Sequence, residues 1–83
     1  MISPEKIETA IGLCVIAVTK YIMKKFNLSP EEAYAKLLSL ELFELIEDAE
    51  SGMYLEPNEY LFECTDIEIS QGSDALFDYL AVT

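Results

Sequence analysis

The amino-acid sequence predicts an all-α protein, a compact four- or five-helix single domain in which the N-terminal helix is central. Apolar side chains recur at the helical period early in the chain, and two sites carry the residue types that begin helices. The chain has 83 residues, which is too few for two separate hydrophobic cores. We therefore expect residues 1–83 to form one acidic helical domain.

The first helix is expected over residues 4–26. Ser3 can cap its first turn, and Pro4 suits the first helical position because no N–H is needed there. Residues 13–17 are apolar on every side, so this helix is either the centre of a small bundle or a seam between copies of the chain. Gly12 weakens a helix interior and suggests a close helix crossing. The apolar positions with helical spacing are Ile7, Ile11, Cys14, Val15, Val18 and Ile22.

A second helical region begins with a clear start signal. Ser29 and Glu32 have the spacing of a capping box, and Pro30 takes the first helical position. The apolar pattern changes phase at Ser39. Either one helix spans residues 30–48, or two shorter helices meet at a bend near Ser39, and we favour the bend.

The chain then turns at Gly52, which can adopt the positive φ of a helix C-cap. Residues 53–55 are expected to be a short extended crossing, because Pro57 disfavours helix at the residue before it. A further helix is expected to begin at Pro57.

The C-terminal part leaves one choice open. Residues 65–70 alternate polar and apolar side chains, a pattern that suits a strand as well as a continuing helix. Gly72 is expected to break the chain, with Ser73 capping a last helix over residues 74–80.

Charge divides the chain into two halves. The first 36 residues hold four acids and all five lysines, a net charge of +1, whereas the rest hold twelve acids and no base, a net charge of −12, which together give −11. There is no arginine and no histidine. Because phosphate binding depends mainly on Lys and Arg, we expect no direct nucleic-acid binding.

The sequence also argues against membrane insertion and export. Its longest apolar run, residues 10–18, is nine residues long, whereas about 20 are needed to cross a bilayer. The positive flank and small-residue cleavage site of a signal peptide are not recognisable. We therefore expect a cytoplasmic protein that does not enter a membrane, with Cys14 and Cys64 as reduced core thiols.

No pattern for catalysis, cofactor binding or metal binding emerges. Glu41, Glu44 and Glu47 share one side of a helix, which is typical of a solvated face. A calcium loop with Gly52 in its sixth place would have Ala49 in the third, where an oxygen ligand is needed. Neither a serine nor a cysteine can have a histidine as base. We expect a non-enzymatic protein with no cofactor and no metal site.

Binding is the function class that remains. Aromatic and acidic side chains interleave over ten residues, a composition that could anchor and steer a basic partner. Some of these aromatic residues must instead belong to the core of so small a domain. Tyr54 and Tyr60 are the expected anchors, because tyrosine combines apolar area with a polar tip. The candidate partner-binding residues are Tyr54, Glu56, Glu59, Tyr60 and Glu63.

Residues 29–54 contain Ser29-x-x-Glu32-Ala33, then Phe43, then Asp48-x-Glu50-Ser51-Gly52-x-Tyr54. This pattern resembles small, mostly uncharacterised helical proteins of gut-type anaerobic bacteria, and it covers about a third of the chain. Some similar short proteins look like components encoded beside toxin-like enzymes. The resemblance implies an acidic neutralising partner and carries over no catalytic residue.

Three functions follow as hypotheses. The first is a protein-interaction module, an acidic antitoxin-like or nucleic-acid-mimicking partner of a basic protein. The second is a structural homo-oligomer without a ligand, in which the apolar centre of the first helix is the seam. The third is a carboxylate-based enzyme or metal site, which requires several acids to converge in a pocket.

Overall fold

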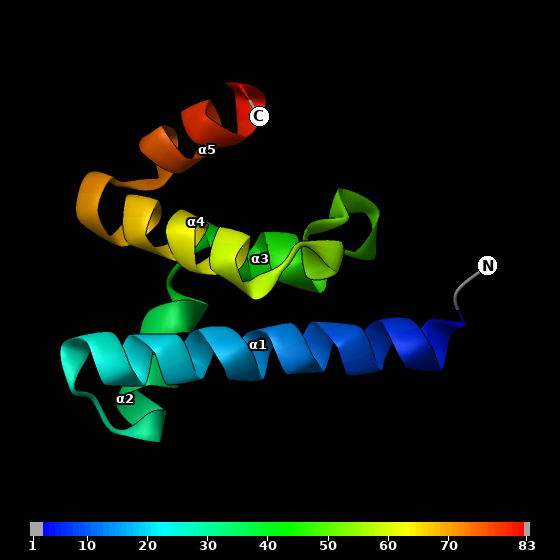
Figure 1. Ribbon diagram of the computed structural model, residues 1–83, viewed down its shortest axis with the longest axis horizontal. Helices are drawn as coiled ribbons and strands as arrows, with labels where there is room; N and C mark the ends of the chain where they lie inside the picture. The colour runs from blue at the N-terminus through cyan, green and yellow to red at the C-terminus, as the bar shows by residue number, and fades with distance from the viewer. Residues whose placement is uncertain (1–2, 83) are drawn as a thin grey trace.

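The computed structural model describes residues 3–82 and is built from helices. No strand occurs within this range. The expected all-α fold is confirmed, with five α-helices. They are α1 (Pro4–Phe26), α2 (Pro30–Leu38), α3 (Glu41–Glu47), α4 (Asn58–Gln71) and α5 (Ser73–Val82), with two 3₁₀ turns, η1 (Ala49–Ser51) and η2 (Met53–Leu55), between α3 and α4 (Figure 1).

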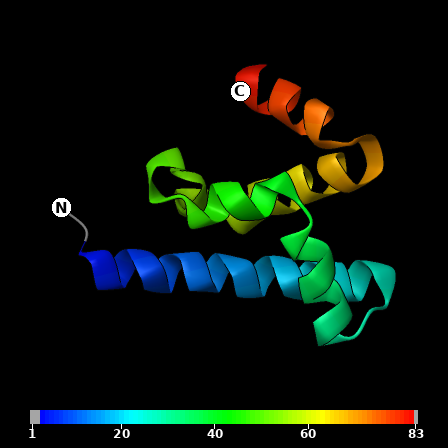
Figure 2. The ribbon, with the colours of Figure 1, turned by 180° about the vertical axis from the view of Figure 1, so that it is seen from behind.

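The long helix α1 runs along one side of the molecule, and most other elements pack on it (Figure 1). Helix α2 crosses its C-terminal half, while α3 and α4 lie side by side along it (Figure 2). Helix α5 folds back and packs mainly on α4. The molecule measures 37 × 31 × 19 Å. The expectation of a central N-terminal helix is therefore confirmed, although α5 lies away from it.

The helix ends follow the sequence signals closely. Asn27 adopts a left-handed conformation with φ 55° and closes α1. In the capping box of α2, the Ser29 Oγ accepts from the Glu32 backbone N–H at 3.2 Å, and the Ser29 N–H donates to Glu32 Oε1 at 2.9 Å. The hydrogen bond from the Ser29 backbone holds the pKa of the Glu32 carboxyl below its ordinary value.

The bend favoured near Ser39 is confirmed. Helix α2 ends at Leu38 and α3 begins at Glu41, so the two helices turn independently toward the core. This explains the change of phase, because each helix must bury its own apolar positions. The buried residues are Ala33 and Leu37 on α2 and Leu42 and Ile46 on α3, with Leu40 between them.

In the middle of the chain, the structure corrects one expectation and decides one open choice. Residues 53–55 form a 3₁₀ turn and not an extended crossing, because Gly52, at φ 73°, and the turn residues close short backbone hydrogen bonds. This turn buries the side chains of Met53 and Tyr54. Residues 65–70, left open between strand and helix, belong to α4, which buries Thr65 and Glu68 against its neighbours.

The centre of α1 is not enclosed on all sides. Leu13 is 62% exposed and Ile16 is 51% exposed, whereas Cys14 and Val18 are buried. The expectation that Gly12 marks a close crossing is wrong within the chain, since a Cβ added there would meet no atom within 4 Å. One face of α1 thus remains uncovered.

The core is continuous through all five helices. Cys14 and Cys64 lie in it as free thiols, as expected. Burial raises the pKa of Cys14, and burial together with the nearby Glu63 raises the pKa of Cys64 to about 11.

Among residues 3–82, the structure has no helix that combines the length and the apolarity needed to cross a membrane.

Candidate interaction surface

The structure separates the five predicted partner-binding residues into two groups. Glu56 is exposed just before α4, Glu59 and Glu63 are exposed along it, and Tyr60 is half-buried beside them. Tyr54 is different, because it is only 9% exposed and belongs to the core. The expectation that Tyr54 is an exposed anchor is therefore wrong, since the 3₁₀ turn directs its side chain inward.

The ring of Tyr60 lies against a neighbour from α5. The ring centroids of Tyr60 and Tyr79 are 5.9 Å apart, with the planes tilted by 31°. The Glu63 carboxylate accepts a hydrogen bond from Tyr79, and this bond, followed by burial, raises the pKa of Tyr79 to about 12. Sequence spacing gave no signal for this contact, because Tyr79 is on another helix.

A hollow adjoins these residues where α3, η2, α4 and α5 meet. Its volume is about 310 Å³. Glu56 and Tyr60 stand on its wall, so the structure brings two of the predicted residues together at a concave site. The residues that line it are Leu45, Ser51, Met53, Glu56, Tyr60 and Leu80.

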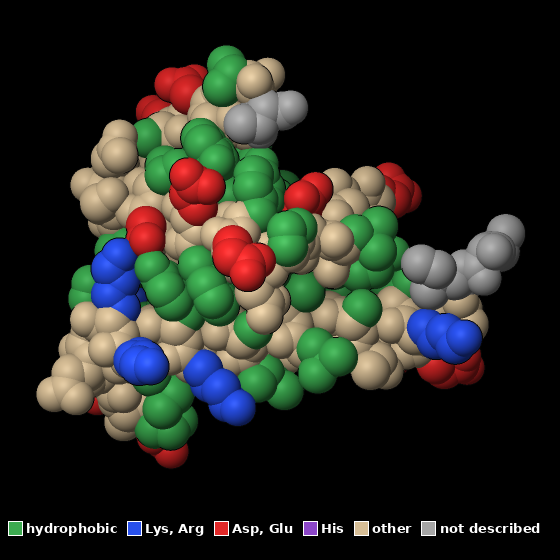
Figure 3. All heavy atoms as spheres, viewed as in Figure 1, with side chains coloured by type: hydrophobic (Ala, Val, Ile, Leu, Met, Phe, Trp, Pro, Cys, Tyr) green, Lys and Arg blue, Asp and Glu red, His purple; other side chains and the backbone are tan. Residues whose placement is uncertain are grey.

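Most of the acids in the second half of the chain point into solvent. Figure 3 shows red side chains mainly over the upper part of the molecule, and blue side chains along α1, both over its C-terminal half at the left and near its N-terminal end at the right. The exposed acids after residue 36 are Glu41, Glu44, Glu47, Asp48, Glu50, Glu56, Glu59, Glu63, Asp74 and Asp78.

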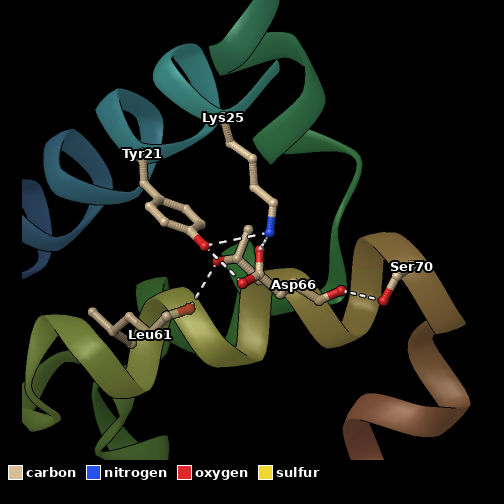
Figure 4. A network of polar contacts seen from close by, with 6 residues as sticks. Tyr21, Lys25, Leu61, Asp66 and Ser70 are labelled. Carbon is tan, nitrogen blue, oxygen red and sulfur yellow. Dashed lines mark hydrogen bonds and ion pairs between the residues drawn. The ribbon is translucent and has the colours of Figure 1, made fainter. Parts of the chain in front are cut away.

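Asp66 is one of the two remaining acids, and it joins α4 to α1 (Figure 4). The Tyr21 hydroxyl donates to Asp66 Oδ2 at 2.6 Å, and Lys25 Nζ donates to Oδ1 at 2.5 Å. Burial raises the pKa of Asp66, but the hydrogen bonds from Lys25 and Tyr21 outweigh this effect and hold it below its ordinary value. The Tyr21 ring also stacks on Phe62, with centroids 4.3 Å apart.

Glu68 is the other remaining acid, and it is only 5% exposed. Its carboxylate accepts hydrogen bonds from the backbone N–H groups of Glu41 and Leu42, at 2.7 and 3.0 Å. The Ser73 hydroxyl donates to the same carboxylate at 2.9 Å. The expectation that Ser73 caps a helix starting at residue 74 is wrong, because Ser73 is itself the first residue of α5. The sequence contains one signal for this contact. Leu40, the residue before α3, has no side-chain acceptor, so the first N–H groups of that helix need an acceptor from elsewhere in the chain.

The acids of α3 do not gather into a site. Glu41, Glu44 and Glu47 are exposed along the helix, in agreement with a solvated face. Within residues 3–82, no three His, Cys, Asp or Glu side chains are grouped so that they could hold a metal ion.

Comparisons with protein-family models, with curated protein sequences and with solved structures find no match to this chain.

Proposed function

We propose that this protein is a non-enzymatic interaction module whose acidic half binds a basic protein. The observation that carries the proposal is the exposure of the acids. Ten of the twelve acids after residue 36 are exposed, as the burial of each side chain shows. Ordinary surfaces mix both signs of charge, so a one-signed surface needs a reason beyond solubility.

The lysines do not neutralise this surface. Within residues 3–82 the one ion pair joins Lys25 to Asp66, where α1 meets α4. Lys6, Lys20 and Lys24 are exposed at earlier positions of α1, and Lys36 is exposed on α2. The fold therefore keeps the acids of α3, α4 and α5 available to a cationic partner, whose approach they would accelerate.

The hollow beside Tyr60 is the expected centre of the contact. The half-buried ring of Tyr60 is held in place by its contact with the ring of Tyr79. Because this side chain is already ordered before binding, it loses little conformational entropy when a partner packs against it. Glu56, Glu59 and Glu63 stand around it as exposed carboxylates. A Lys or Arg side chain from the partner could pair with these carboxylates while an apolar side chain enters the hollow.

Two forms of partner fit this chemistry. A toxin-like enzyme is the form implied by the resemblance of residues 29–54 to small proteins encoded beside such enzymes. A nucleic-acid-binding protein is the other, because a row of carboxylates can occupy sites that otherwise hold phosphates. In both cases, the partner contributes the basic surface.

The first test is affinity capture from an extract of the organism that encodes the protein, at about 50 mM and about 500 mM salt. One basic protein should be captured at low salt and lost at high salt. Recovery of the protein alone in both conditions would contradict the proposal.

The second test uses the captured partner and two matched triple variants. Glu56→Gln, Glu59→Gln and Glu63→Gln remove three charges around Tyr60, and Glu44→Gln, Glu47→Gln and Asp78→Asn remove three elsewhere on the acidic half. Both triples should slow association equally, because steering depends on total charge. Only the first triple should speed dissociation, by about tenfold or more, because only it removes direct contacts.

A third measurement separates the two forms of partner. If the captured protein binds DNA or RNA, this chain should displace the nucleic acid in proportion to its occupancy of the partner. Simultaneous binding of both would exclude mimicry and leave the toxin-like form.

A further inference from the structure

The outer face of α1 is a feature that the acidic surface does not explain. Leu13 and Ile16 project from the middle of this helix and are more than half exposed. Ile16 borders a groove of about 410 Å³ between α1 and α2. Apart from Lys20 and Thr19, the groove is apolar, and its walls are Val15, Ile16, Met23, Pro30 and Tyr34.

Charge is ordered along this face. Glu8, Gly12, Ile16, Lys20 and Lys24 follow one another at intervals of four, so they form one row along the helix. Glu5, Thr9 and Leu13 form the row beside it. Glu5 and Glu8 near the first end and Lys20 and Lys24 near the other are exposed, with Leu13 and Ile16 between them. Lys6 is also exposed at the first end, so the charges there sum to −1, whereas Lys20 and Lys24 give +2 at the other end.

Two pairs of these side chains are placed symmetrically about the middle of the helix. Leu13 and Ile16 are equally far from the point between residues 14 and 15, and so are Glu5 and Lys24. A face of this kind is complementary to itself when it is turned end for end. A parallel copy would instead place lysine beside lysine and acid beside acid.

We propose that a second copy of this chain packs antiparallel on α1, in a two-fold symmetric dimer. Each Leu13 enters the groove beside the other copy's Ile16, and each acidic end lies against the other copy's Lys20 and Lys24. Gly12, where an added Cβ would meet no atom of this chain within 4 Å, lets the two backbones approach closely at the crossing.

Net charge supports this choice of face. Two copies with a net charge of −11 each repel one another, so their acidic surfaces must stay apart. Cys14 and Val18 on α1 are buried, whereas Leu13 and Ile16 are exposed, and α3 and α4 pack along one side of this helix (Figure 1). Pairing through α1 therefore leaves both acidic halves on the outside, each free for the proposed basic partner.

The experiment is sedimentation equilibrium of the whole chain from about 5 μM to about 1 mM, a range that covers weak dimers. We expect a reversible monomer–dimer equilibrium. Ile16→Glu should weaken the dimer by at least tenfold, and Leu55→Glu, at a side chain that is 64% exposed elsewhere, should leave it unchanged. A monomer throughout, equal effects of both variants, or aggregates that grow beyond a dimer would each overturn the proposal.

Charge reversal tests the antiparallel arrangement. Glu5→Lys with Glu8→Lys changes the net charge from −11 to −7, since each reversal adds two. If net repulsion alone governed association, this variant would dimerise more tightly; the proposal expects at least tenfold weaker dimerisation. Lys20→Glu with Lys24→Glu should weaken it likewise, and an equal mixture of the two variants should form a heterodimer. Failure of the mixture to associate would overturn the arrangement, provided that both variants keep the circular dichroism of the parent.

Discussion

Glu68 on α4 accepts a hydrogen bond from the backbone N–H of Leu42 in the first turn of α3, with 3.0 Å between Oε1 and N. The first N–H groups of a helix have no partner within it, and an acid there also interacts favourably with the helix dipole. The same carboxylate accepts from Glu41 and Ser73. One side chain therefore holds the start of α3, the body of α4 and the start of α5 together.

Substitution of Glu68 should destabilise the protein markedly. Glu68→Ala leaves two backbone N–H groups and the Ser73 hydroxyl without their acceptor, and the hydrogen bond of the Leu42 N–H is a buried one. The free energy of unfolding should fall by about 2–4 kcal/mol, because hydrogen bonds to charged groups and unsatisfied buried donors are both costly. Urea denaturation followed by circular dichroism measures this change.

Glu59→Ala is the matched control for Glu68, since Glu59 is exposed on the same helix. Its effect should stay within about 0.5 kcal/mol. Similar losses in the two variants would show that Glu68 does not act through its hydrogen bonds.

The Asp66 network predicts a loss of stability in acid. The pKa of Asp66 is lower in the folded chain than its ordinary value of 3.8. Its contribution is therefore present above this value and is lost as the pH falls through the lower, folded value. Asp66→Asn should lower the melting temperature at pH 7 by a few degrees, and the difference should vanish as the pH falls toward 2. A constant difference at every pH would contradict this account.

Tyr79 predicts a late step in alkaline titration. Its pKa is raised from 10.0 to about 12 in the folded chain, where the hydrogen bond to Glu63 favours the neutral phenol. The stabilisation is present below pH 10 and is lost as the pH rises toward 12. Absorbance near 295 nm should show this step, and Tyr79→Phe should reduce its amplitude by one tyrosine; the pKa of Tyr21 is also raised, by its hydrogen bond to Asp66. Tyr34→Phe, at an exposed ring, should leave it in place.

The two thiols should be protected from reagents while the protein is folded. Burial raises the pKa of both Cys14 and Cys64, and only the thiolate reacts. At pH 8, a disulfide reagent should label them slowly in buffer and promptly in denaturant. Rapid labelling of one thiol in buffer would show that its part of the core opens locally.

Added salt should stabilise the fold. Ten exposed acids after residue 36 repel one another, and screening by salt weakens this repulsion. The melting temperature should rise between about 20 and 300 mM NaCl. A flat response would mean that the acids interact too weakly to affect folding.

Local signals predicted the helices well wherever their chemistry is contained within a few residues. Ser29, Pro30 and Glu32 begin α2 as expected, and Ser39 marks the bend before α3. The prediction for residues 53–55 was wrong because their conformation depends on burying Tyr54. The backbone carbonyl of Tyr54 accepts a hydrogen bond from the thiol of Cys14, which is 40 residues away in the sequence. Only the folded chain supplies that contact.

The exposure of the candidate partner-binding residues was predicted in part. Glu56, Glu59 and Glu63 are exposed, as a partner surface requires, and their role in binding stays a prediction. Tyr54 and Tyr60 could not be told apart by sequence, since both are aromatic residues with similar neighbours. The structure buries the first and places the second at a hollow shared with α5.

By itself, the sequence determined the helical class, most helix ends, and the separation of a weakly basic first half from a strongly acidic second half. Capping, periodicity and charge are local properties, so they can be read along the chain. The tertiary structure decided which acids serve the fold and which remain in solvent. Asp66 and Glu68 resemble their neighbours in sequence, yet packing places one beside Lys25 and the other beneath the first turn of α3, since only three-dimensional proximity determines the partner of a charge.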